Sequence, residues 1–289
     1  MLYRDAEDWL AASRKRVLLF GMSGLGKTHV ASMLRETGDW FHYSIDYRIG
    51  TRYMGEHISD LFKREAMRVP ALRDLLLSDS IRIDSKIRFH NLAPLSMYLG
   101  KPGDPAKGGL PFEEYMRRQE QHREAETAAL LETARFIIRA EEIYGYRNFV
   151  CDSGGSICEV VDPDDPADPV LTALEDAALL VWIEGSEAHT EALVRRFDRA
   201  PKPMYYQPAF LRAQWSAYLE ETGLAEDAVD PDAFVRHVYA RALAHRQPRY
   251  AAMARRGITV SADEVAGLHD AAGFARLIAR ALERRGAAV

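Results

Sequence analysis

The chain has 289 residues, of which 47% are apolar, so it can form one large domain or two small ones with a sizeable core. Its formal net charge of -5 argues against a general binder of nucleic acids or anionic membranes, while leaving room for a local basic pocket. The N-terminal stretch MLYRDAEDWLAASRKR lacks a long apolar core, and no apolar run reaches the ~20 residues that cross a bilayer. We therefore expect a cytoplasmic protein with no membrane partner. Cys151 and Cys158 are not spaced C-x-x-C, and we expect them to be reduced structural thiols.

Five short apolar segments are predicted to be strands covered on both faces, because they run without polar alternation. They are residues 16–21, 40–46, 147–153, 178–185 and 257–263. Helical patterns occupy residues 27–36, 112–143, 188–199, 232–256 and 271–284. The alternation of strands and helices predicts an α/β fold with a mostly parallel five-stranded sheet, whose ligands bind at the carboxyl ends of the strands.

About a hundred residues separate the second and third strands, far more than a simple crossover needs. We predict that residues 1–49 and 147–289 form the core, and that residues 50–146 form an inserted, mainly helical subdomain. This subdomain is expected to contact either a substrate or a protein partner.

The stretch GMSGLGKT fits the phosphate-binding pattern G-x-x-x-x-G-K-[ST], with an apolar strand before it and an amphipathic helix after it. Glycines allow backbone N–H groups to converge on phosphate oxygens, and the following helix adds its positive end. Lys27 is expected to reach the β- and γ-phosphates, and the Thr28 hydroxyl to ligate Mg²⁺. The predicted nucleotide-binding residues are Gly21, Met22, Ser23, Gly24, Leu25, Gly26, Lys27, Thr28, His29 and, from a later helix, Arg195.

A carboxylate from a neighbouring strand normally assists the metal, and Asp152 ends the apolar run NFVCD. It can hold Mg²⁺ through water or bind substrate directly. The structural alternative is that Asp152 caps the next helix.

Polar residues that follow the second strand suit an acceptor. Asp46 can orient or deprotonate an attacking hydroxyl, and Arg48 and Arg52 suit an anionic substrate group. The alternative for all three is an ordinary polar loop. After the third strand, Gly154 and Gly155 allow a substrate to approach the backbone closely.

Two further groups of arginines lie downstream. Arg195, Arg196 and Arg199 crowd the end of a predicted helix, where a closing segment can neutralise charge on a transferred phosphoryl group. A basic helix C-terminus is also favourable by itself, through the helix dipole. Arg246 and Arg249 flank a proline, and either can clamp a carboxylate or phosphate bidentately, surface charge being the alternative.

These stretches, in this order, resemble the shikimate kinase branch of the P-loop small-molecule and nucleoside-monophosphate kinase superfamily, over residues 17–65 and 148–282. The resemblance implies a P-loop NTPase three-layer sandwich that uses ATP and Mg²⁺. It implies that Asp46 binds the substrate hydroxyl, that Ser153–Gly155 matches a substrate-contacting Gly-Gly-Gly turn, and that Arg196 is the catalytic arginine of the lid. It also implies that Arg246, in R-x-P-x-Y, holds a substrate carboxylate, and that residues 261–264 lie near the adenine.

The sequence departs from that family at three places. Ser44 replaces the first aspartate of its D-x-D, the glycine triplet is Ser-Gly-Gly, and the insertion is several times longer. Shikimate is therefore not the expected acceptor. The string GMSGLGKT is also similar to signalling ATPases related to plant resistance and apoptosis proteins, but their downstream pattern is missing.

Three functions follow. The first is an ATP/Mg²⁺-dependent phosphotransferase acting on a hydroxyl of an anionic small or medium-sized acceptor, with Lys27, Asp46, Asp152, Arg196 and Arg199 as catalytic residues. The second is an ATP-hydrolysing regulator that grips a protein partner through residues 50–146. The third, polynucleotide phosphorylation, is disfavoured by the acidic balance. No N/T-K-x-D guanine motif is visible, so ATP is preferred to GTP.

Overall fold

The structure is a computed structural model that describes residues 2–287. The chain divides into two compact units. Unit 1 comprises the residues up to Ile45, Glu126–Pro201 and the residues from Arg236 onward, and unit 2 comprises Asp46–Ala125 and Lys202–Val235. Three of the four boundaries fall inside helices, α3 (Ile45–Arg48), α7 (Phe112–Leu131) and α13 (Pro231–Ala254), each of which contributes residues to both units; the fourth lies between Pro201 and Lys202.

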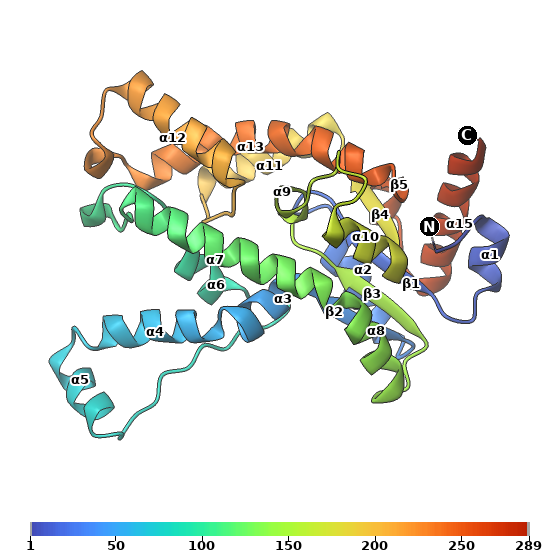
Figure 1. Cartoon of the computed structure of the whole chain (residues 1–289), viewed down its shortest axis with the longest axis horizontal. Coiled ribbons are helices and arrows are strands. Elements are labelled where there is room, and N and C mark those ends of the chain that lie inside the picture. The colour runs from blue at the N-terminus through green and yellow to red at the C-terminus, as the bar shows by residue number, and fades with distance from the viewer. Residues whose placement is uncertain (1, 288–289) are drawn as a thin grey trace. The chain divides into compact units, whose positions relative to one another are not determined.

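Unit 1 holds a five-stranded sheet with every pair parallel, in the order β2-β3-β1-β4-β5 (Figure 1). The strands are β1 (Arg16–Phe20), β2 (Trp40–Ser44), β3 (Asn148–Asp152), β4 (Leu179–Glu184) and β5 (Ile258–Ser261). All five predicted strands are confirmed, with ends that differ by one or two residues. The predicted fold class is also confirmed, because helices cover both faces of this sheet.

The two faces of the sheet are distinguished by β2. Phe41 and Tyr43 point toward α8 (Thr133–Glu142), where both rings stack with Phe136. Trp40 points the other way and meets Phe274 of α15 (Ala271–Ala287) edge to face. The α2 helix (Lys27–Glu36) lies on the α15 side, because right-handed crossovers from β1 to β2 and from β2 back to β3 require opposite faces.

Shorter helices complete unit 1. They are α1 (Ala6–Ala11), α9 (Ile157–Val160), α10 (Pro169–Ala177), α11 (Glu187–Arg199) and α14 (Ala262–Ala266). The α10 helix packs on α8 and β4, and α1 packs on α15, where the Trp9 indole donates to the Ala275 carbonyl at 2.9 Å. The central strands read as continuous apolar runs because they are buried on both faces; Val17, Leu18, Leu19 and Phe20 are all buried.

Unit 2 is helical. It contains a π-helical turn at Ile49–Tyr53, α4 (Gly55–Ala66), α5 (Pro70–Leu77), α6 (Ala93–Leu99), α12 (Pro208–Thr222), and two short 3₁₀ turns at Pro105–Lys107 and Glu226–Ala228. Its aromatic core brings distant segments together: Trp215 stacks on Phe112 at 4.7 Å between ring centroids and meets Phe234 edge to face.

This division differs from the predicted one in three places. Residues 46–49, predicted to belong to the core, belong to unit 2. Residues 202–235 join the helical unit, because Trp215 and Phe234 complete its core. Residues 126–146 belong to unit 1, which contains the sheet, because α8 covers β2 and β3. The single helix predicted over 112–143 is two helices, with α8 starting anew after Glu132.

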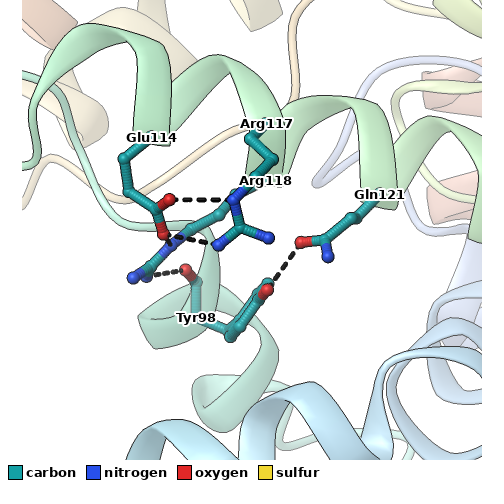
Figure 2. Close-up of polar contacts among 5 residues, drawn as sticks. All are labelled: Tyr98, Glu114, Arg117, Arg118 and Gln121. Atoms are coloured by element: carbon teal, nitrogen blue, oxygen red, sulfur yellow. Dashed lines mark hydrogen bonds and ion pairs between the residues drawn. The ribbon is translucent and has the colours of Figure 1, made fainter.

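A charged cluster fastens α7 to α6 inside unit 2 (Figure 2). The Glu114 carboxylate accepts from Nη2 of Arg117 at 2.8 Å and from Nε of Arg118 at 2.7 Å. Arg118 also donates to the Tyr98 carbonyl at 2.5 Å, and the Tyr98 hydroxyl donates to Gln121 at 2.6 Å. The hydrogen bond from Arg117 lowers the pKa of Glu114, and the one from Arg118 acts in the same direction.

We predict that Glu114→Gln is less stable than the unchanged chain at neutral pH, and that this difference in stability disappears at acidic pH. A carboxylate whose pKa is lowered by folding stabilises the fold above its unfolded pKa, about 4.3, and this contribution is lost as pH falls through the folded pKa. Urea midpoints measured from neutral to acidic pH should therefore differ at neutral pH and converge in acid. Glu124→Gln, at an exposed position of the same helix, is the control. A constant difference between the Glu114→Gln and unchanged chains at all pH values would contradict the prediction.

Candidate functional site

The predicted phosphate-binding loop connects β1 to α2, as the motif requires. Gly26 occupies the position before the first helical residue in a left-handed conformation, with φ at +96°. A residue with a Cβ adopts this conformation only at a cost, so the sharp entry into α2 depends on glycine here. The first N–H groups of α2 have no partner within the helix, which makes this end suited to an anion.

Lys27 lies inside the loop. Its side chain is buried, and Nζ donates to the Gly21 carbonyl at 2.7 Å and to the Met22 carbonyl at 2.9 Å. The ammonium group is thus fixed among the backbone groups that the motif assigns to phosphate. Thr28 and His29, in the first turn of α2, are exposed.

Asp152 is the last residue of β3, and its side chain is buried. Register pairs it with Leu19 of β1 on one side and with Ser44 of β2 on the other. Because β1 leads directly into the phosphate-binding loop, the carboxyl end of β3 places Asp152 beside that loop. The capping alternative is wrong: the residue before α9 is Ser156, and α9 receives no side-chain cap.

His42 is a neighbour of Asp152 that the sequence reading missed. Its Nε2 lies 3.7 Å from Oδ2 of Asp152, and its side chain is fully buried. The available signal was a polar residue at an inward position of an otherwise apolar strand, in WFHYS. A buried imidazole at this distance can orient the carboxylate from behind.

The Ser-Gly-Gly turn after β3 packs directly on the phosphate-binding loop. A Cβ atom added at Gly155 would lie 2.6 Å from Oγ of Ser23, closer than real Cβ contacts allow. Ser153 Oγ donates to the Leu19 carbonyl at 2.8 Å, and the Tyr250 hydroxyl donates to the Gly155 carbonyl at 2.5 Å. The absence of a side chain at Gly155 therefore allows this turn to pack closely against Ser23 of the loop. Gly154, next to it, is buried.

Arg196 reaches the phosphate-binding loop from α11. A Cβ atom added at Gly24 would lie 2.8 Å from Nη2 of Arg196, so the guanidinium lies in the space beside Gly24 that a side chain there would occupy. The helix is held there by Leu193 and Phe197, both buried, and the Phe197 ring stacks on Tyr239 of α13 at 3.8 Å.

Arg195, Arg196 and Arg199 of α11 are all exposed to solvent. Arg195 pairs with Glu191 one turn earlier, at 3.2 Å, and Arg199 is exposed in the last turn. Both positions also suit the negative end of the helix dipole. For Arg195 and Arg199, the alternative that they only stabilise the helix C-terminus therefore stays open. The side chain that lies beside Gly24 of the loop is that of Arg196.

Arg246 is buried in α13 and forms an ion pair with Glu159 of α9, with 2.5 Å between Nε and Oε1. Burial works against the charge of Arg246, but the adjacent carboxylate outweighs it and raises the pKa of the guanidinium. Arg249 donates to the carbonyls of Cys158 and Val161 at 2.6 and 2.8 Å. The surface-charge alternative is therefore wrong for Arg246, and both arginines hold the segment after the Ser-Gly-Gly turn.

Cys151 and Cys158 are buried free thiols, and burial raises the pKa of Cys158 to about 12.

The remaining predicted residues belong to unit 2. Asp46 lies in α3, two residues beyond the end of β2, and Arg48 holds its guanidinium 5.7 Å from the centre of the Tyr53 ring. Arg52 is exposed on the π-helical turn, an uncommon conformation that often accompanies functional sites. A cavity of 230 Å³ opens beside this turn, and its lining includes Gly50, Thr51, Ser59 and Asp84.

Together, these features define the class of the protein: a three-layer α/β fold with a phosphate-binding loop after its first strand. Among solved structures, the chain is similar to a shikimate kinase from Bacteroides thetaiotaomicron, with 17% sequence identity and a TM-score of 0.37, over 95% of this chain and 97% of that chain. No protein-family model and no curated protein matches the chain. Across residues 2–287, every helix is too short or too polar to span a bilayer.

We predict that Glu159→Ala lowers the free energy of unfolding by about 3–5 kcal/mol, because it leaves the Arg246 charge buried without its carboxylate. Urea denaturation measures the change. The double variant Glu159→Leu with Arg246→Met should recover most of the loss, since no charge then remains buried. Glu191→Ala, which breaks an exposed ion pair, should cost no more than ~1 kcal/mol. Equal losses in Glu159→Ala and Glu191→Ala would show that the buried pair has no special structural weight.

Proposed function

We propose that the protein is an ATP- and Mg²⁺-dependent phosphotransferase that acts on a hydroxyl of an anionic small or medium-sized acceptor. The observation that carries the proposal is the position of the Arg196 guanidinium beside Gly24 of the predicted phosphate-binding loop. A cation at this position would lie next to the terminal phosphates of a bound nucleotide. Nucleotide binding alone requires the loop, whereas phosphoryl transfer also requires cations that meet the charge of the migrating group.

The loop residues and Asp152 are suited to the nucleotide and its metal. Lys27 would exchange loop carbonyls for β- and γ-phosphate oxygens, and the backbone N–H groups of residues 21–28 would surround them. The Thr28 hydroxyl and the Asp152 carboxylate are hard oxygen donors, the kind that Mg²⁺ prefers, and Mg²⁺ usually takes one or two protein carboxylates beside phosphates and water. When bound, the metal would neutralise charge on the phosphates. His42 would keep the Asp152 carboxylate oriented.

The acceptor's hydroxyl oxygen would attack the γ-phosphorus, the bond from that phosphorus to the bridging oxygen would break, and ADP would leave. Asp46 would take the hydroxyl proton or orient the hydroxyl. Arg196, with Arg199, would stabilise the charge on the transferring group, whereas Arg195 pairs with Glu191 at the surface. Most of the rate would come from positioning and electrostatics rather than from a covalent intermediate.

The acceptor's anionic group would be bound by Arg48 and Arg52, with the Ser-Gly-Gly turn at Gly154 and Gly155 beside the acceptor. Arg246 can take part only if that group replaces Glu159 as its partner, and breaking a buried ion pair is costly. We therefore expect Arg246 to contribute less to acceptor binding than the sequence implies.

We predict ATP consumption with a panel of hydroxylated carboxylates and phosphate esters, measured as ADP release and as ³¹P transfer to the acceptor. Lys27→Ala should abolish nucleotide binding. Arg196→Ala should bind ATP with little change but lower kcat by about a thousandfold, because its interaction strengthens as the phosphoryl group transfers. Asp46→Asn should lower kcat as well.

Arg195→Ala is the matched control within α11, with a much smaller expected effect on kcat, because Arg195 pairs with Glu191 at the surface. A protein that binds ATP, transfers phosphate to no acceptor in the panel, and keeps its only activity in Asp46→Asn would refute the assignment.

A second candidate is an ATP-hydrolysing regulator that grips a protein partner through residues 50–146. The observation that favours it is the exposed apolar surface of α5, which lies in this region. In a pull-down, a partner retained with ATP and lost with Lys27→Ala would support this candidate. Retention that is indifferent to both ATP and Lys27 would count against it.

A further inference from the structure

The α5 helix carries an apolar surface that unit 2 does not cover. None of its residues is buried, and Leu72, Leu75 and Leu77 are 38%, 42% and 72% exposed, with Val69 just before the helix at 47%. In Figure 1, α5 lies beyond the end of α4. A helix this short is marginal in water without a packing partner. Exposed apolar residues grouped on one short segment typically mark a contact surface.

Unit 1 contains a groove of 540 Å³ between α8 and α10, remote from the carboxyl ends of the strands. Its position is fixed by Arg16, the first residue of β1, and by Ala177, which precedes β4. The apolar part of its lining comes from Ala134, Ile137, Ile138, Ala173 and Ala177. Ile138 is 55% exposed. The groove thus offers an apolar surface that the described part of unit 1 leaves open to solvent.

The charged residues that line the groove are predominantly acidic. Three carboxylates, from Glu141, Glu142 and Asp176, line it together with the single guanidinium of Arg16. The α8 helix ends at Glu142 and α10 ends at Ala177, so two helix C-termini meet here. Carboxylates in a last turn are unfavourable, because the negative end of the helix dipole repels them. Glu141 is compensated by Arg14, at 2.8 Å, whereas a positively charged partner would relieve the others.

We propose that this groove binds α5 from a second copy of the same chain. The leucines of α5 would contact the apolar lining, as an amphipathic helix does in a groove, and Arg68 and Arg73 would meet Glu142 and Asp176. Arg68 and Arg73 now form exposed ion pairs with Glu65 and Asp74, which contribute little and exchange at low cost. Every copy carries both the helix and the groove, so reciprocal docking closes a dimer and one-way docking builds a longer assembly.

Sedimentation velocity on the full chain, from about 1 to 100 µM, tests the proposal. We expect the fraction of associated chains to rise across this concentration range. Leu75→Glu and Ile138→Glu should each weaken the association at least tenfold, because each places a carboxylate in the apolar contact. Met97→Glu in unit 2 and Leu10→Glu in unit 1 alter equally exposed apolar residues outside the two surfaces, and should leave association unchanged. A monomer at all concentrations, or association indifferent to Leu75→Glu and Ile138→Glu, would overturn the proposal.

A cysteine cross-link identifies the occupant. The native thiols are buried, so new cysteines at Leu75 and Ile138 would be the reactive ones. Mixing Leu75→Cys chains with tagged Ile138→Cys chains should give a disulfide-linked pair, which Leu75→Cys mixed with Leu10→Cys should not. A chain carrying both Leu75→Cys and Ile138→Cys that closes its disulfide only within itself would overturn the second-copy assignment. Recovery of a foreign protein instead of a second copy in the cross-link would overturn it as well.

Discussion

The parallel direction of all five strands is the constraint on which the candidate site depends. Because every strand runs the same way, all carboxyl ends reach one edge of the sheet, and residues far apart in the chain meet there. The phosphate-binding loop leaves β1 at this edge, and Asp152 ends the adjacent β3. Parallel strands with both faces covered also require long apolar runs, which is why the strands could be recognised in the sequence.

A second layer of interactions holds the loops at this edge in place. The Ser-Gly-Gly turn rests on Ser23, the Tyr250 hydroxyl fixes the turn's carbonyl, and the Arg246–Glu159 ion pair anchors α9 behind it. Arg196 is positioned through the stacking of Phe197 on Tyr239 of α13. One long helix therefore supports both the turn and the arginine. A phosphoryl-transfer site needs this kind of rigid support, since displacement of a charged group by a fraction of an ångström weakens its electrostatic effect.

The candidate site could be predicted in the parts that depend on local chemistry. The motif around Lys27 carries its own conformational demands, through glycines and a helix start, and these demands hold in any tertiary context. Asp152 could be placed because it ends an apolar run. Arg246 shows the limit of such reasoning. Its motif indicates a cation for an anionic ligand, but the structure supplies Glu159 from a short helix that has no sequence signal of its own.

By itself, the sequence determined the five strands, the α/β class and the glycine-rich loop between β1 and α2, because apolar periodicity and glycine placement are properties of neighbouring residues. Tertiary structure alone decided that residues 202–235 join the helical unit, that His42 lies behind Asp152, and that Arg196 lies beside Gly24. It also decided that the leucines of α5 stay exposed, although the sequence LRDLLL would equally suit a buried helix. These features depend on which distant surfaces meet, and long-range packing has no counterpart in the local pattern of residues.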